Sequence, residues 1–151
     1  MPMVNLQFAT SVHIMISLGY LNQQKTSKTP SCKLANSDML AESIGTNPVV
    51  IRRLLSQLNK AGLIKTARGK KGGVQLNKPA SEISLSDVYK AIEIKDSVKP
   101  HNKPASKDCP VSCSMHEIMS SVSEGYTKAS LKYLDAIKLS DLIKKIKTQK
   151  T

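Results

Sequence analysis

The sequence predicts a mainly α-helical protein with one small β-hairpin and a long helix near its C-terminus. Several segments place apolar residues three and four positions apart, which is the spacing of a helix face. A short glycine-rich segment separates two β-type segments, as in a hairpin. The chain has 151 residues with no Trp and one Phe, so its core must be aliphatic. That length suits one compact domain with an appended element.

Three helices are expected in the N-terminal half, over residues 6–21, 38–44 and 48–61. Ser37 is expected to cap the second helix, and Gly45 to end it. Asn47 is expected to cap the third, with Pro48 at the first helical position, where its missing N–H costs nothing. The apolar residues at helical spacing in the third helix, which should face inward, are Ile51, Leu54, Leu55 and Leu58.

Residues 63–66 and 74–76 are expected to form the hairpin, joined by a segment with three glycines at positions 68–73. Ser84 and Asp87 form a capping-box pattern, which predicts a fourth helix reaching about residue 94. A polar segment with three prolines follows, and then the long helix. Ser140 is expected to cap a last short helix. The predicted parts are residues 1–94, an exposed linker and candidate sensor loop at 95–110, and the two C-terminal helices at 111–147.

Positive charge is concentrated in one part of the chain. The 23 Lys and Arg exceed the 11 Asp and Glu, which gives a net charge of +12. No acid occurs between Ser43 and Ser81, a segment that holds the second half of the predicted helix pair and the hairpin. Such an excess favours a polyanionic partner, with nucleic acid ahead of an anionic membrane, although many soluble proteins are basic for no specific reason.

A short helix, a tight turn, a second helix and a hairpin follow one another in the order of a winged helix-turn-helix. In that motif the second helix enters the major groove of DNA, and the hairpin, or wing, lies over the neighbouring minor groove or backbone. Arg52 or Arg53 is expected to bond guanine or hold a phosphate, and Val49 or Val50 to contact a thymine methyl. Arg68, Lys70 and Lys71 lie in the glycine-rich wing, where they are expected to meet a high density of phosphates. The sequence therefore predicts a 1–94 DNA-binding domain and double-stranded DNA as the partner.

The chain also resembles the Rrf-two-type family of bacterial transcription regulators. The resemblance is carried by LAES, by LxxLxxAGLI, by RGxxGG before a strand, and by ISLSDVxxAIE. It covers residues 5–94, and more weakly the last long helix. It implies a winged helix with a long helix that crosses its partner in a homodimer, binding pseudo-palindromic operators, usually as a repressor. By position, the resemblance gives Val49, Val50, Arg52 and Arg53 as DNA-reading residues. It also implies that Arg68 contacts the minor groove and that Ser37 lies near a phosphate. Asn47, the expected cap of the third helix, completes the predicted set of DNA-binding residues.

The long helix indicates a dimer on chemical grounds as well. Apolar residues recur along it at three- and four-residue spacing from Met115 to Ile137. A single helix cannot bury such a face alone, so it must pack on its own domain or on a second copy. A two-fold dimer would place two reading helices one DNA turn apart, about 34 Å.

Cys109, Cys113 and His116 lie at the entrance of the long helix. In several relatives this region supplies three cysteines to an iron–sulfur cluster, but a cluster needs about four ligands and one upstream cysteine is missing here. Zinc on the same residues, a thiol switch that involves Cys32, and cysteines without a function all remain open. No cofactor is firmly predicted.

Other functional classes fit the sequence less well. Cys109, Cys113 and His116 are the only candidates for catalysis, and the glycines at 69–73 join two strands rather than a strand and a helix, so no enzyme is predicted. A non-specific nucleic-acid-binding protein fits the charge but lacks the aromatic platforms of single-strand binders. Three cysteines and the lack of a long apolar run predict a cytoplasmic protein without a membrane span.

Overall fold

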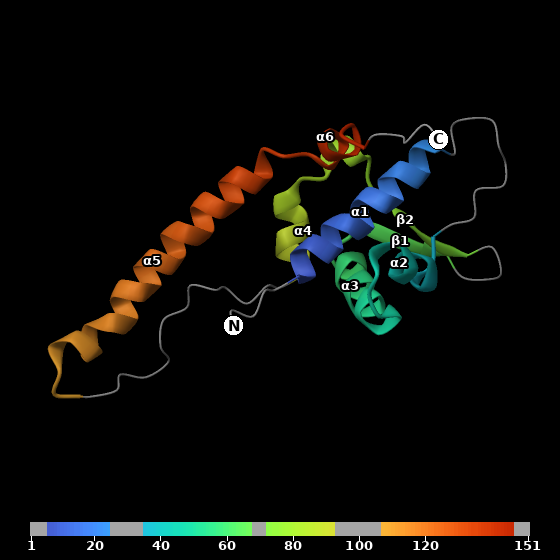
Figure 1. Ribbon diagram of the computed structural model, residues 1–151. Helices are drawn as coiled ribbons and strands as arrows, with labels where there is room; N and C mark the ends of the chain where they lie inside the picture. The colour runs from blue at the N-terminus through green and yellow to red at the C-terminus, as the bar shows by residue number, and fades with distance from the viewer. Residues whose placement is uncertain (1–5, 25–34, 68–71, 93–106, 147–151) are drawn as a thin grey trace. The chain divides into compact units, whose positions relative to one another are not determined.

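The computed structural model describes residues 6–24, 35–67, 72–92 and 107–146 (Figure 1). Cys32, Arg68, Lys70, Lys71 and most of the predicted linker lie outside these ranges. The fold class is confirmed: the described chain is mainly helical, with one two-stranded sheet and a long C-terminal helix. The elements are α1 (Gln7–Gln24), α2 (Ser37–Ile44), α3 (Pro48–Lys60), β1 (Ile64–Ala67), β2 (Gly73–Leu76), the 3-10 helix η1 (Ala80–Glu82), α4 (Leu85–Ala91), α5 (Pro110–Asp135) and α6 (Leu139–Ile143).

The chain forms two compact units. The first comprises Met1–Ile94 together with Asp135–Thr151, and the second comprises Lys95–Leu134. Residues 111–147, which include α6, were predicted as one part; in the structure α6 packs in the first unit against α1. Leu139 and Ile143 of α6 are both buried there. Helix α6 thus completes the core of the first unit.

That core is aliphatic, as the composition requires. The inward face predicted for α3 is confirmed, because Ile51, Leu54 and Leu58 are 0% exposed and Leu55 is 8% exposed. These side chains join buried residues from α1, the hairpin, α4 and α6 in one cluster. Burial of these faces fixes the rotation of α3 about its axis, so its opposite face is held towards solvent.

Helix caps define the turn between α2 and α3. The Asn36 side chain accepts a hydrogen bond from the Met39 N–H at 2.9 Å, and Ser37 is the first helical residue, so the prediction of Ser37 as the cap was wrong by one position. Gly45 ends α2 with φ of 79°, a left-handed conformation that favours glycine. The Asn47 side chain accepts from the Val49 N–H at 2.9 Å, as predicted for the cap of α3.

The hairpin is tied to both neighbouring helices. β1 and β2 pair antiparallel, with Ile64 opposite Leu76. The Val74 N–H donates to the Ala35 carbonyl at 2.8 Å, so β2 is bonded to the residue just before α2. Asn77 donates from its side-chain amide to the Gly62 carbonyl at 3.0 Å, at the turn that follows α3. The hairpin is therefore held against the start of α2 and the end of α3.

A chain of polar side chains connects the start of α4 to the end of α5. Ser84 and Asp87 form the predicted capping box. The Ser84 and Ser86 hydroxyls lie 2.8 Å apart, and Ser86 donates to the Asp135 carboxylate at 2.9 Å. The Ser86 hydrogen bond is the main cause that lowers the pKa of Asp135. Because the folded pKa lies below the unfolded one, this contact adds stability above the ordinary pKa and loses it as pH falls.

The predicted cap of the last helix was wrong in the same way as that of α2. Lys138 occupies the capping position of α6, and its N–H donates to the Asp141 carboxylate at 3.2 Å. Ser140 lies inside the helix. The Asp141 carboxylate, three residues beyond the cap, accepts the N–H of the capping residue, as the acid of a capping box does.

Gly19 marks the closest approach of α1 to α6. A Cβ at this position would overlap Cδ1 of the buried Ile143. We therefore expect Gly19→Leu to lower the free energy of unfolding by about 1–3 kcal/mol through overpacking. Apart from its chain neighbours and the backbone of its own helix, Gly125 in α5 has no heavy atom within 4 Å of an added Cβ, so Gly125→Ala should leave stability unchanged or raise it by about 0.5–1 kcal/mol. Chemical denaturation measures both, and equal effects would show that the α1–α6 contact is absent.

Candidate nucleic-acid interface

The outward face of α3 presents three of the predicted DNA-contacting residues. Val49 is 64% exposed, and Arg52 and Arg53 are both exposed. Val50 is only partly exposed, because its side chain packs against the core cluster. The described structure thus offers Val49 and the two arginines to a partner, and Val50 to a lesser extent.

Asn47 and Ser37 lie at the two helix starts of the helix-turn-helix. The Asn47 side-chain oxygen is occupied by the cap of α3, which leaves its amide N–H groups for a ligand. Ser37 is partly exposed at the first position of α2. The N–H groups at a helix start favour an anion, so both positions suit a phosphate.

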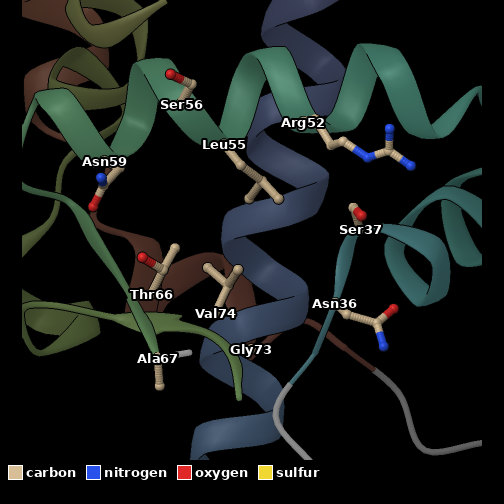
Figure 2. A pocket seen from close by; sticks show the side chains of 10 residues that line it. All are labelled: Asn36, Ser37, Arg52, Leu55, Ser56, Asn59, Thr66, Ala67, Gly73 and Val74. Carbon is tan, nitrogen blue, oxygen red and sulfur yellow. The ribbon is translucent and has the colours of Figure 1, made fainter. Parts of the chain in front are cut away.

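An open cavity with a volume of about 420 Å³ lies between α3, the hairpin and the start of α2 (Figure 2). Figure 2 shows Leu55 and Val74 at its centre, and the Arg52 side chain extending from α3 along the side of Ser37. Asn59 and Thr66 line it at the end of α3 and on β1. The complete lining is Asn36, Ser37, Arg52, Leu55, Ser56, Asn59, Thr66, Ala67, Gly73 and Val74. We call this surface the α3–hairpin cavity.

Positive charge predominates in the chain segment that supplies most of the α3–hairpin cavity. No acid lies between residues 43 and 81 of the sequence, and the lining contains none. The exposed cations of this region that the structure describes are Arg52, Arg53, Lys60, Lys65 and Lys78. Within the described residues, none of these five cations forms an ion pair with an acid. The ion pair that is present joins Lys128 and Glu124 on α5. Their charges therefore remain available to an anionic partner.

Three residues of this surface were not predicted from the sequence. Asn36, Asn59 and Thr66 were not predicted as site residues, although each lines the α3–hairpin cavity. One signal was present: Arg52, Leu55, Ser56 and Asn59 follow helical spacing and therefore share one side of α3. The contribution of Thr66 depends on how the hairpin packs, which the spacing of residues does not reveal.

The cysteine segment has a different geometry from a metal site. Cys109 lies just before α5, where hydrogen bonds from the backbone N–H and hydroxyl of Ser112 lower the pKa of its thiol. The Cys113 thiol donates to the Lys107 carbonyl at 3.3 Å. Among the residues that the structure describes, no three His, Cys, Asp or Glu side chains gather as a metal site would require.

The described helices also include none that is long and apolar enough to cross a membrane.

Comparison with known proteins places the chain in a family. The family model that matches residues 4–145 is Rrf2, described as an iron-dependent transcriptional regulator. The described residues do not supply the donor set of an iron site. The match covers nearly all of the described structure.

Individual relatives agree with this assignment. YwnA of Bacillus subtilis (strain 168), named as an HTH-type transcriptional regulator, is 29% identical over 141 residues, covering 93% of this chain and 97% of that protein. The solved structure of CymR, the global cysteine regulator of B. subtilis, is 21% identical and aligns with a TM-score of 0.60, covering 97% of this chain and 100% of that one. T. potens IscR is 23% identical with a TM-score of 0.63, over 96% and 92% of the two chains.

The two structural likenesses show the same fold, and the family match covers the helix-turn-helix, the hairpin and the long helix together. The chain belongs to the Rrf2 family of transcriptional regulators and is a DNA-binding regulator rather than an enzyme.

Proposed function

We propose that this protein is a dimeric, sequence-specific regulator that binds a pseudo-palindromic operator and acts as a repressor. The observation that carries the proposal is the exposed arginine face of α3 beside a cavity without acids. Helix α3 enters the major groove, and the hairpin extends towards the neighbouring groove. Repression follows the role that the family resemblance implies, with the operator overlapping a promoter.

The two arginines take different roles in this proposal. Arg52 lines the α3–hairpin cavity beside Ser37, at the start of α2, and therefore holds a phosphate. Arg53 lies outside that lining and is exposed, so it is free to form a bidentate contact with guanine. Val49, which is 64% exposed, contacts a thymine methyl. Arg68, Lys70 and Lys71 of the wing add backbone and minor-groove contacts.

The proposed homodimer is supported by the surface of α5. No residue of this 26-residue helix is buried within the chain. Its exposed apolar side chains include Ile118, Val122, Tyr126 and Tyr133, each at least 50% exposed. Their spacing places them on one face, and a face of this size needs a partner to cover it. A second copy with the same face satisfies this need by two-fold symmetry.

A thiol switch is the second candidate function, favoured by the lowered pKa of Cys109. A peroxide would oxidise the Cys109 thiolate to a sulfenic acid and release hydroxide. The Cys113 thiol, one helical turn further on, would then displace water to form a disulfide. Peroxide treatment should change the operator affinity of the protein but not that of a Cys109→Ser variant. Equal responses of the two proteins would exclude this switch.

The main proposal is tested by selection from a random duplex library with the full chain, followed by competition with scrambled DNA. The expected result is one enriched two-fold symmetric sequence, bound at least a thousandfold more tightly than scrambled DNA. Enrichment of no sequence, with binding that depends on salt alone, would identify a non-specific nucleic-acid-binding protein instead.

A further inference from the structure

We infer that the α3–hairpin cavity seats one phosphodiester group of the DNA strand, held chiefly by neutral hydrogen-bond donors, Asn59 and Thr66 among them. This inference rests on the proposed function, because it takes α3 as the helix that enters the major groove. It assigns a role to residues that lie outside the predicted set of DNA contacts.

The α3–hairpin cavity lies where one strand of a bound DNA duplex would pass. A single sugar–phosphate backbone separates the major groove from the minor groove beside it. A protein with one helix in the major groove and a hairpin reaching the next groove must straddle that backbone. The α3–hairpin cavity is the surface between these two elements (Figure 2), so it faces the strand that is straddled.

The polar side chains that line the cavity are mostly neutral. It contains one cation, Arg52, and no carboxylate. The neutral polar residues of the lining are Asn36, Ser37, Ser56, Asn59 and Thr66. Within the described part of the chain, the side chains of Ser56, Asn59 and Thr66 form no hydrogen bond. Hydroxyl and amide groups left without a protein partner on a concave, positively charged surface suit an anion that accepts several hydrogen bonds.

The cavity has an apolar base, and its sides are formed by elements that hydrogen bonds hold in place. Leu55 and Val74 are 8% and 7% exposed and form an apolar floor, against which the carbon face of a deoxyribose can lie. The volume of about 420 Å³ lies within the range of small-ligand sites. The hydrogen bonds from Val74 to Ala35 and from Asn77 to Gly62 fix the walls before DNA arrives. The cavity is therefore preorganised, and little ordering is required on binding.

The use of neutral donors has a measurable consequence. A cation that binds a phosphate releases a counterion and adds to the salt dependence of binding, whereas a hydroxyl or an amide does not. Loss of Asn59 or Thr66 should therefore weaken binding at every sequence by the same factor, without a change in the slope of log affinity against log salt. Neither a base-reading residue nor a phosphate-binding cation produces this combination.

The test compares the wild-type protein with Asn59→Ala, Thr66→Val and the combined variant, on selected and scrambled duplexes at several salt concentrations. Each single change should lower affinity roughly tenfold on both duplexes, as expected for a lost hydrogen bond to a charged group. Thr66→Ser retains the hydroxyl and should bind like the wild type. Arg52→Ala, which removes a cation, should reduce the salt slope by about one. Thermal unfolding of each variant verifies that the fold is retained.

A methylphosphonate scan of the selected duplex identifies the phosphate itself. Neutralising one phosphate per half-site should weaken the wild-type protein clearly, and the combined Asn59→Ala, Thr66→Val variant much less. Equal penalties for the two proteins would overturn the inference, as would variants that bind like the wild type or lose affinity at one sequence only. If the wild type selects no sequence at all, the proposed function fails instead, and the two failures are distinguishable.

Discussion

Arg53→Ala is expected to lower affinity for the selected operator by roughly 10- to 100-fold while leaving affinity for scrambled DNA nearly unchanged. A bidentate arginine–guanine contact discriminates by about 1–3 kcal/mol against the wrong base. Arg53 is exposed on α3, outside the α3–hairpin cavity, so its loss should not disturb the fold or the backbone contacts. Competition binding on matched and scrambled duplexes measures the effect.

Lys70→Ala is the matched control for a cation that does not read bases. Its removal should weaken both duplexes alike and reduce the salt slope by about one. Arg53→Lys keeps the charge but removes the planar fork, so it should retain affinity for scrambled DNA and lose preference for the operator. Identical behaviour of Arg53→Ala and Lys70→Ala on both duplexes would contradict specific reading by α3.

Val122→Glu should dissociate the proposed dimer and, with it, remove tight operator binding. Val122 lies near the middle of α5 and is 50% exposed within the chain. Burying an unpaired carboxylate in the two-fold contact would cost several kcal/mol, so dimerisation should weaken at least a hundredfold. Sedimentation at micromolar concentration should show a monomer, which binds a half-site but no longer the full palindrome with high affinity.

Lys128→Glu provides the control on the same helix. Lys128 pairs with Glu124 at 3.1 Å, on the face of α5 opposite the apolar side chains, and both side chains are highly exposed. An exposed pair of this kind contributes little, so the variant should remain a dimer. A dimer that survives Val122→Glu, or that is lost equally with Lys128→Glu, would show that the apolar face of α5 is not the contact.

Local signals in the sequence accounted for much of the fold. The Gly45 stop, the Asn47 cap and the Ser84–Asp87 capping box each depend on residues within a few positions, and the structure has all three. The caps at Asn36 and Lys138 were missed by one and two positions, because adjacent polar residues compete for the same role. The type of each element was thus easier to predict than its boundaries.

The contacts that could not be predicted join residues far apart in the sequence. Ser86 binds Asp135 across 49 positions, and Ala35 pairs with Val74 across the helix-turn-helix. No local pattern encodes such pairs, since they depend on how whole elements pack. The same reason explains the candidate site: the exposed arginines of α3 follow from helical spacing, whereas the α3–hairpin cavity exists only once the hairpin is docked.

Methylation interference on the selected duplex tests the central claim, that α3 reads the major groove, most directly. Methyl groups on guanine N7 project into the major groove. We expect methylation at one guanine in each half-site to block the wild-type protein, and the same modification to have no further effect on Arg53→Ala. Interference confined to modifications in the minor groove, or the same interference pattern for both proteins, would contradict the account.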